Sequence, residues 1–394
     1  MAQHRARPGA NGLRRRGVGR GLVCTLLSAV LIAGCVLAWI QIGNHVEREG
    51  DAAAASCVEG PVMVSVIADP DLAPGLAAIA ARYTATRPVV HDRCVTLTVR
   101  PMDATVALAG LRGRWDTRSM GPYPAVWVPQ SSVWAAELMS AVPDRVDGET
   151  ASLVTSPVVL ATVPELARRV AGRLDWGRLP ALAARDDGLA EVDLPDWGSL
   201  RMALPIGPQA DPSVLTAQAV AARVVRATGA LTGDEARSAR VTSAIRTLIT
   251  AAPRSPDGTP AGAATMIADA PDPAAGRLHA TPITEQRLYQ LTMHDTRQRL
   301  AEVVPAGPAP IADFPVIRLK GTRVSQTVAA AVGEFLTFAD APEQLRLVTR
   351  LGFRGAAPLP TATSTVTFPA VADPMPTPET AAVVALNTLM GVTR

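Results

Sequence analysis

The sequence predicts an α/β fold. Over residues 61–139, an apolar strand-like segment is followed by a segment with helical spacing of apolar residues, and this pair occurs three times. The third pair, "PAVWVPQSSVWAAEL" at residues 124–138, shows both patterns directly joined. Residues 125–128 predict a buried strand and residues 132–139 a helix, with Ser131 or Ser132 as its N-cap. A strand that runs into a hydroxyl-capped helix start offers free backbone N–H groups, which favour a polar or anionic group.

The other elements follow the same reasoning through the first half of the chain. In order, we expect a strand at 61–68, a helix at 72–83 capped by Asp69-Pro70-Asp71, a strand at 94–100, a helix at 104–111 and an apolar run at 156–162. This order of strands and helices is typical of a parallel sheet.

The second half is richer in helices. We expect, in order, a helix at 166–174, a strand at 200–204, helices at 211–227 and 234–250, a loop at 251–263, a short strand or helix start at 265–268, a helix at 284–291, strands at 301–304 and 315–319, and helices at 324–337 and 342–351. Residues 356–394 predict a Pro-rich linker with a terminal helix at 379–389.

The N-terminal region predicts export. Residues 1–20 hold six arginines and no acidic residue, and residues 21–43 hold no charge, so a helix of about 34 Å would cross a bilayer core of about 30 Å. The arginines predict a cytoplasmic tail, a single-pass anchor in the cell membrane, a stalk at 44–56 and an extracytoplasmic main module. A cleaved signal peptide and a lipoprotein attached at Cys35 are the alternatives, and both also export the chain.

Charge and cysteine content narrow the class of protein further. Without the six N-terminal arginines, 32 basic residues stand against 35 acidic ones, so a nucleic-acid partner is not expected. Cys57 and Cys94 are the two cysteines beyond residue 43, and in an oxidising compartment they predict a disulfide, with two free thiols as the alternative.

Enzymatic motifs do not occur in the sequence. The five histidines form no HExxH pair, and there is no GxSxG elbow and no phosphate-binding P-loop. Asp186-Asp187, Asp269 and Asp272 indicate solvated loop charges, although a hidden acid/base pair stays open. We therefore expect no enzyme, no catalytic residue, no cofactor and no metal.

Several segments, taken in order, resemble a known family. They are "CVEGPVMVSVIADPDLAPGLAAIAARY", "CVTLTV", "PAVWVPQSSVWAAEL", "SPVVLATVP", "ITEQRLYQL", "LAEVVPAGPAPIADFPVIRL" and the pair "VAAAVGEFL" and "LGFR", within residues 57–355. This set resembles the bacterial extracellular solute-binding proteins of the type 2 periplasmic-binding fold. The resemblance is closest to actinobacterial membrane-anchored members in which a von Willebrand factor type A domain follows.

Two features depart from the family pattern. Members often carry Pro-Asp-Ser-Ser after the third strand, where this sequence has Gln130 in place of the Asp. The sequence to Arg394 contains no type A domain and no Asp-x-Ser-x-Ser metal motif, so the resemblance implies no metal-dependent adhesion here.

The resemblance implies a two-lobed clamp. Lobe one would comprise residues 58–153 and 307–355, and lobe two residues 156–304. The chain would cross a hinge near 152–156 and again near 303–307, and a ligand would lie between the lobes at the carboxyl ends of the strands.

Eight residues are candidate ligand contacts. They follow strands or begin helices, and helix capping or hinge hydrogen bonding is the alternative role for each. The candidates are Asp69, Pro70, Asp71, Ser131, Ser132, Thr155, Ser156 and Thr284. Trp127 and Trp134 lie within apolar runs and predict core packing in preference to sugar stacking.

The function implied is capture of a small polar or anionic solute and its delivery to an ABC permease. The alternative is an envelope-sensing or protein-interaction module derived from the same fold.

Overall fold

The computed structural model describes residues 31–45, 57–148 and 151–392. The chain divides into two units, Met1–Val58 and Glu59–Arg394. In the first unit, residues 31–45 form a helix with exposed apolar side chains such as Leu31 and Trp39. Within the residues described, we find no helix with the length and hydropathy needed to span a membrane. The predicted tail at 1–20, the start of the predicted anchor at 21–30 and most of the predicted stalk lie outside the described residues.

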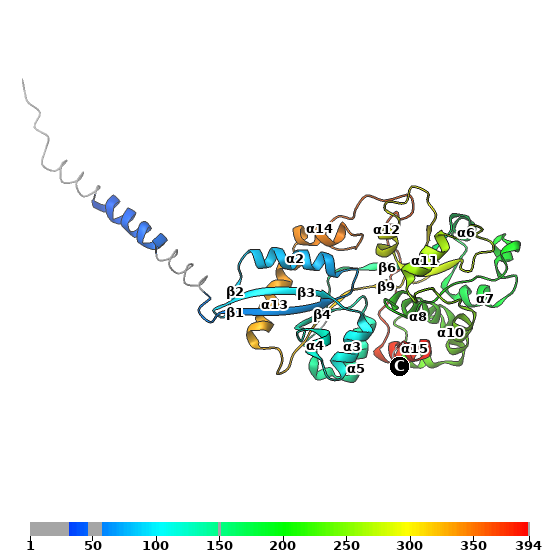
Figure 1. Ribbon diagram of the computed structural model, residues 1–394, viewed down its shortest axis with the longest axis horizontal. Coiled ribbons are helices and arrows are strands. Elements are labelled where there is room, and N and C mark those ends of the chain that lie inside the picture. The colour runs from blue at the N-terminus through cyan, green and yellow to red at the C-terminus, as the bar shows by residue number, and fades with distance from the viewer. Residues whose placement is uncertain (1–30, 46–56, 149–150, 393–394) are drawn as a thin grey trace, which may run out of the picture. The chain divides into compact units, whose positions relative to one another are not determined.

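Lobe one, in the second unit, is built on a six-stranded sheet. Its strands are β1 (Pro61–Ala68), β2 (Val89–Val90), β3 (Arg93–Pro101), β4 (Val126–Val128), β5 (Ala151–Ser152) and β10 (Pro315–Arg318), in the order β2-β3-β1-β4-β10-β5. The central trio β3-β1-β4 is parallel, as predicted, and β10 joins it antiparallel. The packed helices are α2 (Ala73–Ala85), α3 (Ala104–Arg112), α4 (Thr117–Met120), α5 (Ser132–Ala141), α13 (Gln326–Ala339) and α14 (Pro342–Thr349) (Figure 1).

Side chains that alternate along β1 pack against different helices on the two faces of the sheet. Val64 and Val66 of β1 belong to the same core as α2, α13 and α14, whereas Ile67 packs with side chains of α3 and α5. Successive side chains of a strand point to opposite faces, so one strand serves both cores. The predicted Cys57–Cys94 disulfide is confirmed: both cysteines are disulfide-bonded, Cys94 at the end of β3 where it pairs with Pro61.

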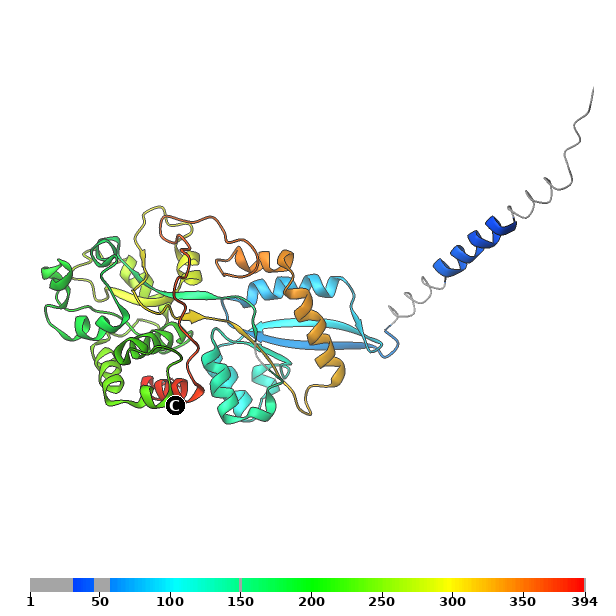
Figure 2. The ribbon, with the colours of Figure 1, turned by 180° about the vertical axis from the view of Figure 1, so that it is seen from behind.

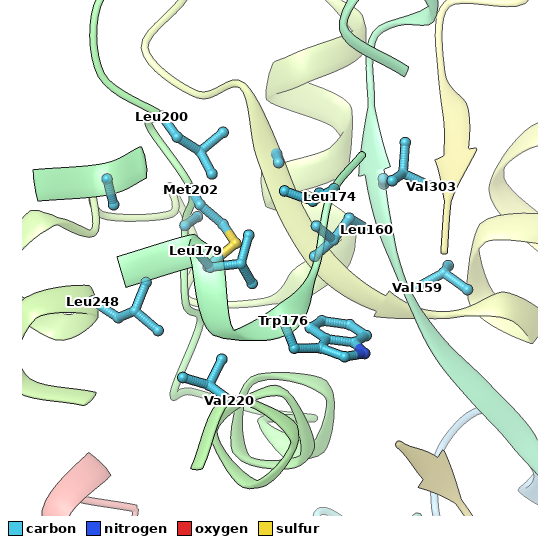
Figure 3. Packing of buried hydrophobic residues seen from close by; sticks show 14 of the residues in the cluster. Val159, Leu160, Leu174, Trp176, Leu179, Leu200, Met202, Val220, Leu248 and Val303 are labelled. Atoms are coloured by element: carbon cyan, nitrogen blue, oxygen red, sulfur yellow. The ribbon is translucent and has the colours of Figure 1, made fainter. Parts of the chain in front are cut away.

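Lobe two has a smaller sheet in which β6 (Ser156–Thr162) is central. β7 (Ala280–Thr284), β8 (Ala301–Val303) and β9 (Ile311–Ala312) each pair with it antiparallel. Its helices are α6 (Pro164–Val170), α7 (Leu179–Ala184), α8 (Asp211–Val225), α9 (Gly233–Arg237), α10 (Ala239–Ala251), α11 (Pro260–Ala268) and α12 (Glu285–Thr292). The core gathers Leu160, Trp176, Leu179 and Val220 from four different elements (Figure 3).

The chain passes twice between the two sheets. β5 pairs with β10 in lobe one, and β6, four residues later, lies in lobe two. On the return, β9 still pairs with β6 while β10 pairs with β4, so the change of sheet falls at Asp313 and Phe314. The structure thus places the return later in the chain than residues 303–307, where the sequence analysis expected it.

Some local predictions differ from the structure for identifiable reasons. Residues 200–204 form no strand, only a single bridge between Met202 and Ala280. The helix predicted at 234–250 is two helices, because Ser238 has extended ψ and caps α10 by accepting a hydrogen bond from Val241 N. The loop predicted at 251–263 ends earlier, since Thr259 caps α11 and Pro260 begins it.

The C-terminal region also differs from the prediction of a linker. The terminal helix is confirmed as α15 (Thr380–Met390), but the residues before it pack onto the module, with Val366 fully buried. In Figure 2 this segment runs across the middle of the second unit before α15.

Candidate functional site

The candidate site lies where the two lobes meet. Asp69 follows β1, Asp103 follows β3 and Ser131 follows β4, so all three lie at the carboxyl-end edge of the parallel strands. From lobe two, α8 begins at Asp211 and α12 carries Arg287. We call the contact of these groups the seam, defined by Asp69, Asp71, Asp103, Ser131, Trp134, Asp211 and Arg287.

Asp211 makes the central contact of the seam. Ser131 Oγ donates a short hydrogen bond to Asp211 Oδ1, and Trp134 Nε1 lies 2.9 Å from both carboxylate oxygens. All three residues are buried. Because Ser131 and Trp134 belong to lobe one and Asp211 to lobe two, these bonds hold the lobes together.

Asp71 makes a second contact between the lobes. Its Oδ1 accepts from Arg287 Nη1 at 3.1 Å, and its Oδ2 is buried, with the Gln209 side chain near enough to lower the pKa of the carboxyl. Asp69 Oδ1 accepts from Asp71 N at 2.9 Å. The predicted capping role of these two residues is absent, because the N-cap of α2 is Leu72 and no side chain caps it.

Asp103 adds a third contact. Its Oδ1 caps α3 by accepting from Thr105 N at 2.9 Å, and its Oδ2 accepts from Gln209 N of lobe two at 3.2 Å. Gln209 has a φ of +60°, a left-handed conformation that is uncommon outside glycine. Strained backbone of this kind persists where surrounding contacts hold it, as at ligand sites.

The start of α5 is the predicted anion site, and carboxylates of the protein itself lie there. Ser132 N donates to Asp313 Oδ1 at 2.6 Å, and Asp313 is one of the two residues where the chain changes sheet. The Ser131 hydroxyl caps nothing in α5, since it is used by Asp211. The N-terminus of α5 is therefore already satisfied by negative charge.

Burial dominates the electrostatics of the seam. It raises the pKa of Asp69 well above its usual value, and the charges of Asp71 and Asp211 raise that pKa further. Burial also raises the pKa of Asp211 to about 6, although the bonds from Ser131 and Trp134 oppose the rise. The pKa of Asp71 is raised by burial and lowered by the charge of Arg287. The carboxyl groups of Asp69, Asp71 and Asp211 thus resist ionisation in the seam.

The other predicted residues form a separate cluster at the start of α12. Ser156 Oγ accepts from Gln286 N at 3.0 Å, and Thr284 caps the helix by accepting from Arg287 N at 3.2 Å. Thr155 pairs through its backbone with Arg354. The hydroxyl groups of Ser156 and Thr284 thus accept hydrogen bonds from backbone N–H groups at the start of α12. This capping role is the alternative that the sequence left open.

The structure therefore brings together only part of the predicted set. Asp69, Asp71 and Ser131 meet in the seam, with Pro70 and Ser132 beside them in the same two loops. Sequence reasoning missed Asp211, Arg287 and Asp103 as site residues. Trp134 is buried, as predicted for a core residue, yet its ring nitrogen also faces Asp211.

A cavity of about 940 Å³ adjoins the seam on the lobe-two side. It lies between α11 and α12, and Arg287 forms part of its wall. Arg287 is the one residue of the seam that lines this cavity. Within the described ranges, no group of three or more His, Cys, Asp or Glu side chains has a geometry suited to a metal ion.

Comparison with known proteins places this geometry in context. No protein-family model matches the chain. Two Mycobacterium tuberculosis proteins described as uncharacterized, MT1884 of strain CDC 1551 / Oshkosh and Rv1836c of strain ATCC 25618 / H37Rv, are each 35% identical over 373 residues. The match covers 94% of this chain and 53% of each relative, so the chain spans about half the length of these relatives.

Solved structures establish the fold. Iron-bound HitA from Pseudomonas aeruginosa aligns with a TM-score of 0.55 and 15% identity, over 85% of this chain and 99% of that one. The ferric binding protein from Campylobacter jejuni aligns with a TM-score of 0.52 and 8% identity, over 84% and 98% of the chains. The periplasmic binding protein AfuA from Actinobacillus pleuropneumoniae, with fructose-6-phosphate bound, gives 0.52 and 11%, over 84% and 97%. The chain thus has the two-lobed fold of bacterial periplasmic solute-binding proteins, and the neighbours from Campylobacter jejuni and Actinobacillus pleuropneumoniae are binding proteins by name.

Proposed function

We propose that this chain is an extracytoplasmic solute-binding protein that captures a small cationic solute at the seam and delivers it to an ABC permease. The observation that carries the proposal is the convergence of Asp69, Asp71 and Asp211 from both lobes, where Arg287 pairs with Asp71 alone. Two lobes that close on a shared polar contact are the arrangement by which clamp folds enclose small molecules.

The charge of the seam argues for a cation over the anion that the sequence suggested. The seam holds four carboxyl groups, those of Asp69, Asp71, Asp103 and Asp211, against one guanidinium, and an anion placed among them would add negative charge in a medium of low dielectric constant. An ammonium or guanidinium group would instead supply the charge that these carboxylates lack and restore their ordinary ionisation. Asp71 Oδ2, which is buried and shared at most with the Gln209 side chain, is the acceptor that such a donor would use.

Anchoring to the membrane is part of the same proposal. The uncharged segment at 21–43 and the arginines before it support a single-pass anchor with the main module outside, and lipidation at Cys35 is the alternative. Either attachment would hold the module close to a permease in the same membrane.

A melting experiment on the full chain tests the ligand class. The panel would hold 1,4-diaminobutane, L-arginine and tetramethylammonium as cations, glucose and L-serine as uncharged or zwitterionic solutes, and sulfate, molybdate and L-glutamate as anions. A ligand at a hundredfold excess over its Kd stabilises the folded protein by about 2.7 kcal/mol, which raises Tm by several degrees. We expect the rise from a cation alone. A rise from anions alone would overturn the ligand class, and no rise from any member would count against solute capture.

A second function is favoured by one observation, the apolar packing between the lobes. Val214 and Leu215 of α8 belong to the core of lobe one, so the contact between the lobes is partly a continuous hydrophobic core. A clamp that stays closed would present one fixed surface and would act as an interaction or envelope-sensing module. Crosslinking in cells separates the two functions: permease subunits as partners support transport, and envelope proteins with no permease support interaction.

A further inference from the structure

We infer that the C-terminal segment, residues 363–392, is a latch that holds the two lobes of the clamp together. The inference concerns how the seam opens, and it goes beyond what the seam binds. It follows from three sets of contacts: the path of the segment along lobe two, its anchor near the hinge, and the contact of α15 with lobe one.

One side-chain and three backbone hydrogen bonds fix the segment along lobe two. They join it to the strand β8 region, to the loop after β8 and to the turn before α9. The bonds are Thr365 Oγ1 to Leu300 O at 3.2 Å, Ala309 N to Asp373 O at 2.7 Å, Met375 N to Ala309 O at 2.8 Å, and Glu379 N to Leu231 O at 3.0 Å. A loose linker would leave these groups to water, so the segment is an integral part of lobe two.

Arg354 anchors the segment near the hinge. Its guanidinium donates to both carboxylate oxygens of the buried Glu285 at 2.7 Å, and its Nη2 also donates to Pro369 O at 2.7 Å. The ring of Phe368 packs on Tyr289 of α12 with the centroids 5.2 Å apart. The residue that pairs with Thr155 at the first crossing thus also binds the segment.

Helix α15 then reaches lobe one. Asn387 Nδ2 donates to Glu137 Oε1 of α5 at 2.9 Å, and both side chains are buried. Val383 belongs to the lobe-one core, whereas Ala382, Leu386 and Met390 belong to the lobe-two core. Figures 1 and 2 show α15 beside α10, with α5 next to it in lobe one.

Opening of the lobes would therefore break specific contacts of α15. Glu137 also pairs with Arg112 of α3, so the acceptor of the Asn387 bond is itself fixed in lobe one. If α15 stayed on lobe two, opening would separate Asn387 from Glu137 and expose Val383 to water. Because a buried polar group without a partner is costly, these contacts favour the closed clamp.

The distance between the lobes in the full chain tests the latch directly. Spin labels at Arg118→Cys on α4 and Arg246→Cys on α10, two exposed positions, report that distance by double electron–electron resonance. Cys24 and the free Cys35 are replaced by Ser, and the Cys57–Cys94 disulfide is kept. In the wild type, where the latch is intact, the distribution of distances between the two labels should have a single narrow peak.

Asn387→Leu is the test variant and Thr388→Ala, at an exposed position of the same helix, is the matched control. We expect the population at longer distance to rise roughly tenfold or more in Asn387→Leu, as loss of a hydrogen bond to a charged group predicts, and to stay unchanged in the control. If Asn387→Leu does not fold, Asn387→Asp is measured at about pH 8 in its place. This variant keeps the side-chain shape and puts a second carboxylate against that of Glu137, so the two repel each other.

The same narrow distance in both Asn387 variants and wild type would overturn the latch. No ligand is needed for this readout, so its failure is distinguishable from failure of the proposed solute binding. If Asn387→Leu opens the lobes but no member of the melting panel raises Tm, the latch is supported and the proposed solute capture is not.

Discussion

At the scale of residues, the start of α5 in lobe one makes hydrogen bonds to a residue of lobe two. The strand-to-helix turn at 128–132 predicts polar contacts at Ser131 from sequence alone, because a strand end and an N-cap coincide there. The partner of that hydroxyl, Asp211, lies 80 residues away. Asp211 precedes Pro212, which is typical of a helix N-terminus. Nothing in the local sequence distinguishes a carboxylate that caps its own helix from one that accepts hydrogen bonds from the other lobe.

A second buried carboxylate has a pH dependence that can be tested. Burial raises the pKa of Glu302 to about 8, and the neighbouring charge of Glu285 contributes to the rise. In the unfolded chain the pKa of Glu302 has its ordinary value of 4.5, whereas the folded chain keeps this proton up to about pH 8. Folding stability should therefore fall as pH rises through this window, because the unfolded state binds fewer protons there.

Glu302→Gln should remove that pH-dependent loss. We expect the variant and wild type to melt alike near pH 5 and the variant to melt several degrees higher near pH 8.5. The exposed Glu343→Gln on α14 is the control and should follow wild type at both values. Equal melting curves for Glu302→Gln and wild type across the range would show that the carboxyl ionises normally in the fold.

At the scale of elements, patterns within one segment predict most helices and strands. The period of two at 61–68 and the helical spacing at 211–227 match β1 and α8 closely, because each pattern is set by neighbours in sequence. Residues 200–204 are misread as a strand, since a short apolar run predicts burial but not pairing. The packing of residues 363–375 is missed because its Pro- and Thr-rich composition is typical of linkers, and the contacts that dock it, to Leu300 and Ala309, are distant in sequence.

The contact of α2 with α14 makes a prediction about glycine. A Cβ at Gly75 of α2 would lie 2.5 Å from Val348 Cγ1 of α14. Gly75→Ala should lower the free energy of unfolding by about 1–3 kcal/mol, because a well-packed helix contact has no room for a methyl group.

Gly333 of α13 is the matched control, since nothing lies within 4 Å of a Cβ built there. Gly333→Ala should raise stability by about 0.5–1 kcal/mol, as alanine favours the helix. Chemical denaturation of both variants checks the pair. A stabilised Gly75→Ala would mean that α14 moves aside and that the two helices are loosely packed.

At the scale of the whole molecule, the resemblance to solute-binding proteins predicts two lobes and two crossings, and the structure has both. The ligand class that we propose could not be predicted from the sequence, because it depends on charges that the fold brings together from residues 69, 71, 103 and 211. A hydroxyl-capped helix start suggests an anion in isolation. In the fold, Asp313 and Asp211 already lie at that helix start, so the balance of charge is reversed.

Calorimetric titration of the full chain with the most stabilising cation of the melting panel tests the account most directly. The variant is Asp211→Asn, which keeps the side-chain shape and removes the charge, and the exposed Asp144→Asn is its control. We predict that Asp211→Asn binds at least about tenfold more weakly, a change of about 1.4 kcal/mol, while Asp144→Asn binds like wild type. Equal affinity in all three proteins would place the ligand away from the seam and contradict the account.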